Sequence, residues 1–592
     1  MALSRINNPS LIPKGASVSG TTAYGTTALN ALTTGTDNTS IGYLSGQGVT
    51  TGIQNVFVGS RAGSGATTGT SNLAVGYYAM GAGTLTGSNN VAVGQQANWY
   101  NSTGNSNIGI GIYANLNNTT GSFNTSIGVE ANKAGTTANY NTAIGYQALI
   151  SNTASGQTVV GYQAGYSNTT GNVLTAFGNG AAKTNTTGNA VTAIGYLSLY
   201  TSNADRVTAV GQQTLYSNTT GVDNTAMGHQ AGYTNTTGVN NAWYGSAAGY
   251  YNTTGNSNVG FGFQALLNTS SGSNNIAIGQ LAMQTNTTSN NNTAVGHTSM
   301  YSNTTGTINT ALGMQTMYYN TTGSQNVVIG GYSYAGTTGS NNTAVGQGSM
   351  SGGTCTGSNN VALGLNSLNS NTSGSDNVAL GVYALYSCTT SAPNVAVGRD
   401  AGYNVTTGAQ SYGNVLVGYQ SGRNTTTGVD NTLVGGKAGL GITTGNGNHC
   451  FGASAGYQSP FGLIDLTTQS DRIVIGNNNS TNAYVKVAWT VVSDARDKTN
   501  IADIPHGLDF VQQLKPKQYQ FKKSREDDTP HGNLRYGFLA QDVLALEGDT
   551  PVVIDNEQPD HLKYQGESLV PILVKAIQEL KAEFDAYKAT HP

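Results

Sequence analysis

Charge is scarce in this sequence, since only 8% of its 592 residues are Asp, Glu, Lys or Arg, against about 25% in a typical globular protein. The few charges are also unevenly placed. Residues 1–470 carry 9 Lys or Arg and 8 Asp or Glu, whereas residues 471–592 carry 14 and 18. The net charge is −3 and no basic cluster occurs, so we expect neither nucleic acid nor an anionic membrane as a partner. Two physically different regions are therefore joined end to end.

Cysteine and long hydrophobic runs are lacking as well. Cys355, Cys388 and Cys450 are too few and too scattered for a disulfide framework or a zinc site, and we expect no metal or cofactor. No apolar run approaches the roughly 20 residues that span a bilayer, and residues 1–5 do not lead into the apolar segment of a secretory signal. These absences predict a chain that is made in a cytosol and is not inserted into a membrane.

Glycine, by contrast, is abundant, with 82 residues, and it marks a tandem repeat. The pentad Asn-Thr-Ala-Val-Gly recurs with mild variation, and its glycine occurs 26 times between Gly25 and Gly452. The period is 17, with spacings of 16 to 18 except for the longer interval from Gly398 to Gly418. A degenerate last copy ends at Gly476. Internal repeats of about this length indicate a solenoid.

Each repeat is predicted to form one coil of a parallel β-solenoid, with two short strands and two turns. In residues 292–308, Thr-Ala-Val alternates as a half-buried strand does. A second extended piece follows and ends in Asn-Thr-Thr-Gly, a turn signal because Asn and Gly tolerate a positive φ. One coil offers only one or two small apolar side chains to a core, so stacked coils and side-by-side chains must supply the rest.

Other readings of the array are weaker. Collagen requires glycine at every third residue, which does not occur. Disorder is a fair alternative for a sequence rich in Asn, Thr, Gly and Ser, but the fixed apolar residue before each marker glycine argues against it. The many Asn-x-Thr sequons are interpreted as turn chemistry and not as glycosylation sites.

The pentad repeats of residues 20–456 resemble the heads of trimeric autotransporter adhesins, in which three left-handed parallel β-rolls pack together. They are even more similar to the shafts of bacteriophage tail fibres that carry the same pentad. The resemblance implies a mostly β, trimeric, parallel β-solenoid shaft of 17-residue repeats.

A second motif, Ser-Asp-Ala-Arg-Asp-Lys-Thr-Asn-Ile over residues 493–501, lies where the repeats give way to charged sequence. Ser493 and Lys498 suggest a nucleophile with its own base. A serine hydroxyl is inert unless a neighbour takes its proton, and lysine can do so only when burial lowers its pKa below about 10.4. From spacing alone, a solvated loop lysine is the more ordinary reading. Asp494 fits a turn cap better than a catalytic group, Asn500 has a weaker claim, and no histidine is given a role.

The C-terminal region is predicted to be a small α+β domain. We expect a strand over 483–492, a short helix over 504–516 ended by proline, strands over 519–521 and 552–554, and a charged loop over 522–531. A helix is expected from about Ser568, with Pro571 in its first turn. Its apolar residues at spacings of three and four form one seam, which either packs on its own domain or joins a parallel trimeric bundle: Val570, Leu573, Ile577, Leu580, Phe584 and Tyr587.

Residues 490–587 resemble the C-terminal intramolecular chaperone of phage tailspikes and fibres, the endosialidase-type self-cleaving peptidases. The matching positions are Ser493-Asp494, Arg496, Lys498 to Ile501, Leu514 to Pro516, Tyr519, Arg535 to Val543, Tyr564 and Ala576 to Leu580. The resemblance implies a single-turnover serine peptidase and a trimerisation chaperone. In it, Ser493 Oγ attacks the carbonyl of Val492, Lys498 is the general base, and Asp494 and Asn500 are possible supporting residues.

Together the two resemblances imply a phage tail fibre, a homotrimer assembled in the host cytoplasm and carried on the virion. Residues 1–19 are expected to dock to tail or baseplate proteins, 20–456 to form the shaft, 457–492 the distal tip and 493–592 the chaperone. The receptor is expected to be a carbohydrate or a surface protein, and exposed tyrosines either stack on sugars or form a plain ladder. A bacterial trimeric surface adhesin is the alternative, which a missing signal and membrane barrel disfavour. A capsule-digesting spike would need a catalytic insertion in the array.

Overall fold

The computed structural model describes residues 19–390, 393–406, 413–457, 464, 466–477, 479–480, 483–486, 491–522, 525, 527–557 and 559–591. The docking segment expected at 1–19 therefore lies almost wholly outside the described residues. The chain divides into two compact units, Met1–Val382 and Tyr383–Pro592, and each is considered by itself below.

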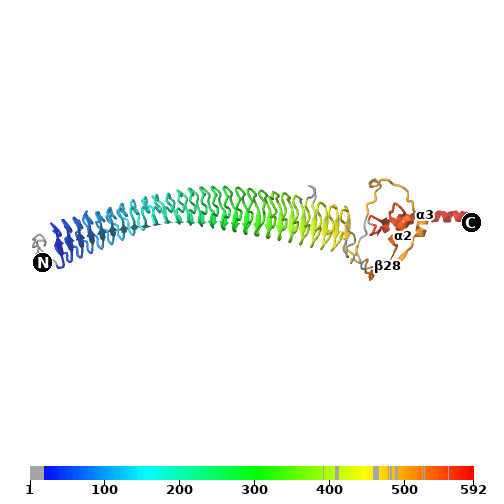
Figure 1. Cartoon of the computed structure of the whole chain (residues 1–592), viewed down its shortest axis with the longest axis horizontal. Coiled ribbons are helices and arrows are strands. Elements are labelled where there is room, and N and C mark those ends of the chain that lie inside the picture. Colours follow the sequence, from blue (N-terminus) through cyan, green and yellow to red (C-terminus); the bar gives the residue numbers. More distant parts are fainter. Residues whose placement is uncertain are drawn as a thin grey trace, which may run out of the picture. The chain divides into compact units, whose positions relative to one another are not determined.

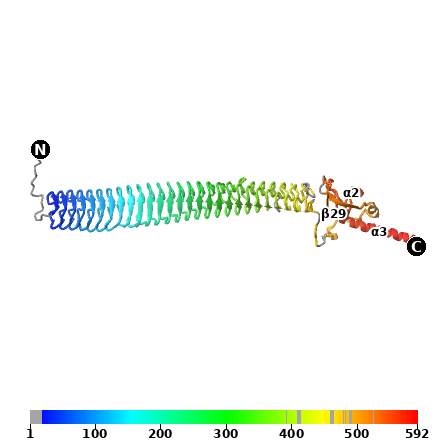
Figure 2. The ribbon, with the colours of Figure 1, turned by 90° about the horizontal axis from the view of Figure 1, so that it is seen from below.

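The first unit is a stack of coils, and each coil contributes one short strand to a parallel sheet (Figures 1 and 2). This confirms the predicted parallel β-solenoid, in which one repeat forms one coil. The strands are β1 (Thr22–Tyr24), β2 (Thr39–Ile41), β3 (Val56–Val58), β4 (Leu73–Val75), β5 (Val91–Val93), β6 (Ile108–Ile110), β7 (Thr125–Ile127), β8 (Thr142–Ile144), β9 (Thr158–Val160), β10 (Leu174–Phe177), β11 (Val191–Ile194), β12 (Thr208–Val210), β13 (Thr225–Met227), β14 (Ala242–Tyr244), β15 (Val259–Phe261), β16 (Ile276–Ile278), β17 (Thr293–Val295), β18 (Thr310–Leu312), β19 (Val327–Ile329), β20 (Thr343–Val345), β21 (Val361–Leu363) and β22 (Val378–Leu380).

The strands pair in register, repeat on repeat, as their alternation predicts. Ala294 at the centre of β17 pairs with Ala311 at the centre of β18, and both side chains are fully buried. The residues on either side of each central residue point outward, because successive side chains of a strand face opposite sides. The coil interior is therefore lined by the central strand residues, and the outer face of the sheet by their flanking neighbours.

The predicted second strand of each coil is wrong. After the marker glycine the chain runs through turns, and in the coil of residues 292–308 both Thr298 (φ 50°) and Met300 (φ 51°) are left-handed. Their backbone groups are satisfied without a strand, because each bonds across coils. Thr298 N–H donates to Gln280 O at 2.9 Å, and Met300 N–H donates to Thr316 O at 2.9 Å. Hydrogen bonds between coils thus replace the strand pairing that was expected for a second strand.

The coil interior is polar as well as apolar, because the asparagine of the pentad is buried. Asn292 accepts a hydrogen bond from the backbone N–H of Asn309 at 2.9 Å and donates to Gly306 O at 2.9 Å. The asparagine of Asn-Thr-Thr-Gly is also buried, and Asn303 closes its own turn on Gly306 O at 3.0 Å. The second contact bears out the turn chemistry that was expected for the sequons.

The marker glycine is required for two reasons. Gly296 has a φ of 136°, which side chains rarely adopt, and a Cβ added to it would lie 2.3 Å from the carbonyl oxygen of Gly313 in the next coil. The same close approach recurs at Gly279, whose added Cβ would lie 2.5 Å from Gly296 O. Tight stacking at this corner explains why the glycine is the most regular residue of the repeat.

The second unit begins with further coils, whose strands are β23 (Val395–Val397), β24 (Val415–Val417), β25 (Thr432–Val434), β26 (His449–Phe451) and β27 (Ile473–Ile475). The pairing of β27 with β26 is parallel and in register, so the stack continues past residue 456 to the degenerate repeat. A small α+β region follows: η1 (Ala495–Asp497), α1 (Leu508–Gln513), β28 (Lys517–Lys522), β29 (Pro530–Gly537), α2 (Ala540–Glu547), β30 (Ile554–Asp555), β31 (Lys563–Tyr564) and α3 (Gly566–Thr590).

This α+β region has its own core, formed by Phe510, Val543, Val553, Ile572 and their neighbours. Several expectations need correction. The strand expected over 552–554 begins only at Ile554, and the charged loop expected over 522–531 is shorter because β29 begins at Pro530. No strand occurs at 483–486 or 491–492, and 487–490 lie outside the described residues; Val492 is 80% exposed and lies apart from any sheet. The last helix also begins at Gly566, so Pro571 lies in its second turn and not its first. The helix tolerates it with the loss of one backbone hydrogen bond.

Candidate functional site

One turn of 3-10 helix, η1, brings the two predicted catalytic side chains together. Ser493 and Lys498 flank this turn, and Lys498 Nζ donates a hydrogen bond to Ser493 Oγ at 2.6 Å. Val492, on the other side of the expected cleavage point, is 80% exposed. The peptide bond before Ser493 is thus accessible, and its serine hydroxyl contacts the amine five residues later.

Asp494 holds the turn in place. It is the N-cap of η1 and accepts a hydrogen bond from the backbone N–H of Arg496 at 2.8 Å. It also forms an ion pair with the Arg496 guanidinium at 2.5 Å. The hydrogen bonds from Arg496 lower the pKa of the Asp494 carboxyl. These contacts are those of a helix cap. They therefore favour a capping role for Asp494 over the catalytic role that the sequence also allowed.

Asn500 is exposed and has a left-handed backbone with a φ of 55°. Asparagine adopts this conformation more readily than most residues. The residue therefore turns the chain just after Lys498. Its suggested supporting role in cleavage stays a prediction.

The geometry allows one chemical step and leaves one condition open. At 2.6 Å from Ser493 Oγ, a neutral Lys498 amine would be close enough to accept the hydroxyl proton, which is what an activated serine nucleophile needs. A lysine acts as a base near neutral pH only when it is shielded from water. Both side chains are exposed in the single chain, so this condition is not met by the single chain as it stands.

The segment after the dyad is anchored to the long helix α3. Glu579 of α3 accepts a hydrogen bond from the backbone N–H of Leu508 at 2.6 Å, at the start of α1. Lys575 of α3 donates to the carbonyl oxygen of Ile504. Gly507 is close to the same carboxylate, since a Cβ added there would lie 2.1 Å from Glu579 Oε2. The sequence alone gives neither Lys575 nor Glu579 such a role.

Glu547 is a structural residue that sequence reasoning missed. It ends α2 and is only 6% exposed. Its carboxylate accepts three backbone hydrogen bonds, from Val552 at 2.8 Å, Val553 at 2.6 Å and Ile554 at 2.9 Å. A buried carboxylate with three N–H donors fixes the loop that leads into β30. Nothing in the local sequence marks this glutamate, because its partners are backbone groups.

The helix α3 has two apolar sides. Leu569, Ile572 and Ala576 are buried in the domain core, and α3 contacts α1. The predicted seam lies on another side and is exposed, and from Leu580 to Thr590 every residue is exposed. In Figures 1 and 2 this C-terminal half of α3 projects from the rest of its domain. The exposed fractions are 56% for Val570, 37% for Leu573, 65% for Ile577, 52% for Leu580, 50% for Phe584 and 60% for Tyr587.

Neither a metal site nor a membrane-spanning helix is found among the described residues. There, no group of three or more His, Cys, Asp or Glu side chains is arranged to hold a metal ion. Within the same residues no helix combines the length and the apolar character needed to cross a bilayer.

Comparison with known proteins identifies the C-terminal region. Residues 493–550 match the peptidase S74 family, described as the chaperone of endosialidase. The match begins at Ser493 and includes Lys498 and Glu547. Among curated proteins, no relative matches the sequence. A long β-solenoid is therefore followed by a domain of the kind that acts as an autoproteolytic chaperone of trimeric fibrous proteins.

Proposed function

We propose that this protein is a homotrimeric bacteriophage tail fibre, whose C-terminal domain aligns three chains and then releases itself by cutting between Val492 and Ser493. The observation that carries the proposal is the hydrogen bond from Lys498 to Ser493, at the first residue of the matched chaperone segment. A domain that only covered the end of the shaft would not need a hydrogen-bonded serine and lysine. The shaft of an adhesin would not need them either.

The proposed reaction is an intramolecular acyl transfer. Ser493 Oγ attacks the carbonyl carbon of Val492, Lys498 takes the hydroxyl proton, and that proton passes to the leaving amine of Ser493. An ester then joins Val492 to Ser493 Oγ. Water hydrolyses this ester, which leaves a carboxylate on Val492 and restores the serine hydroxyl. Each chain cuts once, so the domain is a single-turnover peptidase.

The exposed seam of α3 supports the trimer. An apolar stripe at spacings of three and four suits a parallel helical bundle, whereas an isolated helix projecting into water with this stripe uncovered is unfavourable. The domain core packs on a different side of α3, through Leu569, Ile572 and Ala576. The seam itself therefore does not pack on its own domain, and the trimeric bundle is the packing that we propose for it.

The outer face of the solenoid sheet supports the same assembly. Every strand from β1 to β27 ends in Ile, Val, Leu, Phe, Met or Tyr, and none of these strands contains Asp, Glu, Lys or Arg. The outward residues remain partly exposed in the single chain, as with Phe261 at 56% and Leu363 at 50%. Three copies packed through this face would cover the stripe and leave the charged turns in water.

The repeat itself explains why a chaperone is needed. Coils of nearly identical sequence can pair with a neighbouring chain one repeat out of register at little cost, and long-range pairing between chains is slow. A terminal domain that joins three chains first would fix their register before the coils of the three chains pack together. After that, the finished shaft no longer needs the domain.

The remaining assignments complete this proposal. Residues 1–19 dock to the phage tail or baseplate, 20–456 form the shaft, 457–492 the distal tip, and 493–592 the chaperone. The fibre is assembled in the host cytoplasm, becomes part of the virion, and binds a carbohydrate or protein on the host surface. A trimeric bacterial surface adhesin is the alternative.

Two measurements test the proposal. The purified protein, run on a gel without and with boiling, should show a trimer and then two separate fragments that end at Val492 and begin at Ser493. Antibodies against residues 20–456 should label the tails of phage particles. Labelling of the bacterial envelope with no labelled particles would favour the adhesin, and a monomeric, uncut product would contradict the assembly.

A further inference from the structure

The coil that begins at Gly330 closes its turn differently from the coil of residues 292–308. The interval from Gly330 to Gly346 is one position shorter than the usual period, and Tyr334 takes the place that Met300 and Met317 fill in the preceding coils. Tyr334 is fully buried. Its hydroxyl donates to Gly339 O at 2.8 Å and accepts from the Asn342 amide at 3.1 Å. The tyrosine hydroxyl therefore replaces the buried asparagine that closes this turn in regular coils.

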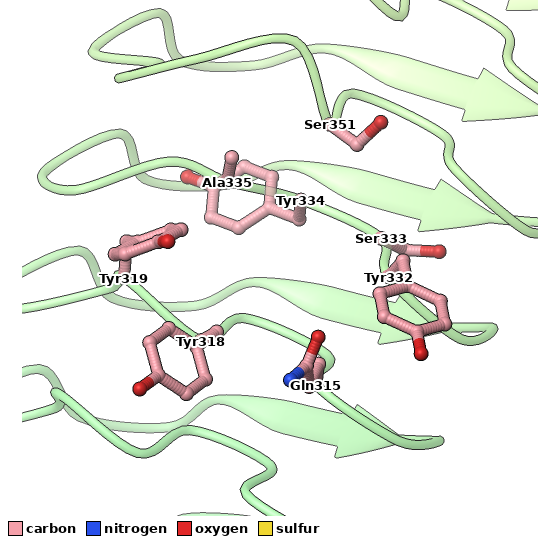
Figure 3. A pocket seen from close by; sticks show the side chains of 8 residues that line it. All are labelled: Gln315, Tyr318, Tyr319, Tyr332, Ser333, Tyr334, Ala335 and Ser351. Atoms are coloured by element: carbon pink, nitrogen blue, oxygen red, sulfur yellow. The ribbon is translucent and has the colours of Figure 1, made fainter.

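A cavity of about 420 Å³ lies beside this coil in the surface of the stack. In Figure 3, Tyr318 and Tyr319 lie to one side and Tyr332 with Ser333 to the other, while Tyr334 and Ala335 lie between them. This volume is within the range of small-molecule sites, roughly 300–1,000 Å³.

The lining predicts the chemistry of the ligand. Tyr319 and Tyr332 are 56% and 50% exposed and present their rings and hydroxyls, and Gln315 adds an amide. A tyrosine has an apolar ring face and a polar tip, so it suits a ligand with an apolar face and many hydroxyls. No lining residue is charged, which disfavours phosphate-rich ligands such as nucleic acid.

The cavity lies on an edge of the coil that remains in water. Gln315 and Tyr332 each follow a marker glycine by two residues, a position that holds Arg61 and Glu130 in other coils. Tyr318 follows its glycine by five residues, where Lys133 occurs in another coil. Charged residues are absent from the strands β1 to β27. In the proposed trimer the sheet face therefore packs against the other chains, while this edge stays in water.

We propose that this cavity, between Tyr319 and Tyr332, is a binding site for a neutral mono- or disaccharide unit. One or more tyrosine rings stack on the apolar face of the sugar, and Gln315 bonds to its hydroxyls. The use of this site in host recognition rests on the proposed function of the fibre. Binding of the sugar to the cavity does not depend on that function. It is thus an attachment point on the side of the shaft, separate from the tip.

The test uses the purified full-length protein and saturation-transfer NMR with glucose, galactose, mannose, N-acetylglucosamine and their disaccharides. Tyr319→Ala and Tyr332→Ala each remove one wall, and Ala335→Trp fills the cavity. Tyr251→Ala is the matched control, because Tyr250 and Tyr251 form the same edge-on pair in a regular coil as Tyr318 and Tyr319 do here. Thermal melting verifies that all variants remain folded.

We expect at least one of these sugars to bind, each cavity variant to weaken its binding about tenfold, and the control to leave it unchanged. The proposal is overturned if no sugar binds, if all three cavity variants bind normally, or if Tyr251→Ala weakens binding equally. Adhesion of the protein to host cells is measured in parallel. Sugar binding without adhesion refutes the host-recognition role alone, and adhesion that survives without sugar binding refutes the cavity site alone.

Discussion

The amine of Lys498 lies 2.6 Å from the hydroxyl of Ser493, although both side chains are exposed in the single chain. This contact pre-aligns the nucleophile and its base without shielding them. A lysine acts as a general base only in its neutral form, and burial favours that form. In the proposed trimer, neighbouring chains would cover the pair, so cleavage should follow assembly.

Breaking the α3 seam should stop both assembly and cleavage. In the double variant Leu580→Lys and Phe584→Lys, two charges replace exposed apolar residues, so the single chain should keep its fold while the bundle fails. Light scattering at micromolar concentration should report a monomer, and mass spectrometry an uncut chain.

Gln578→Lys is the control for that variant, since it adds a charge to an exposed position off the seam. It should stay trimeric and be cut like the parent. A double seam variant that is monomeric and still cut at the parental rate would show that assembly does not activate the site.

Glu547→Gln should destabilise the C-terminal domain. The neutral amide cannot accept three backbone hydrogen bonds as the carboxylate does, so the N–H groups of Val552, Val553 and Ile554 lose charge-assisted bonds. We expect a loss of about 2–4 kcal/mol in the free energy of unfolding, measured by denaturant unfolding of the Ser493→Ala protein. Asp549→Asn, an exposed carboxylate in the following loop, should change stability by less than about 0.5 kcal/mol; equal effects would contradict the assigned role.

Gly296→Ala should open the coil stack locally. The added Cβ would meet Gly313 O in a backbone conformation that alanine disfavours, at a cost on the order of 1–3 kcal/mol for the backbone alone. Hydrogen exchange of the amides from β17 to β18 should become faster. Gly436→Ala places its Cβ in open space and should leave exchange in its own coil unchanged; no difference between the two variants would contradict the stacking argument.

Much of the fold could be predicted because the repeat is regular. The alternation of Thr293, Ala294 and Val295 predicted a half-buried strand, and the spacing of the marker glycines predicted in-register stacking. The second strand could not be excluded in this way, because the left-handed backbone of Thr298 and Met300 is held by bonds to other coils. Local sequence does not encode such partners.

The candidate site was likewise predictable only where it depends on local sequence. Ser493 and Lys498 could be placed together from a local motif, since one helical turn separates them. Glu547 and Glu579 could not be foreseen as anchors, because each bonds to backbone groups whose position depends on the tertiary fold. The cavity beside Tyr334 could not be predicted because its lining residues come from three successive coils.

The chaperone role is tested by comparing two shafts. Residues 1–492 expressed alone should be insoluble or misregistered, whereas the shaft left after natural cleavage should be a soluble trimer. The reason is kinetic, since near-identical coils offer many registers and only the terminal domain distinguishes them. Solubility and thermal melting of the two products make the comparison. If the truncated chain reaches the same soluble trimer unaided, the domain is only a removable cap.

The most direct test of the central claim is the time course of cleavage followed by intact mass spectrometry. The parent chain of 60.7 kDa should give fragments 1–492 and 493–592. Ser493→Ala and Lys498→Ala should remain uncut but trimeric, and Asp497→Ala, an exposed neighbour in the same turn, should be cut normally. Cleavage of either dyad variant between Val492 and Ser493 at the parental rate would contradict the account.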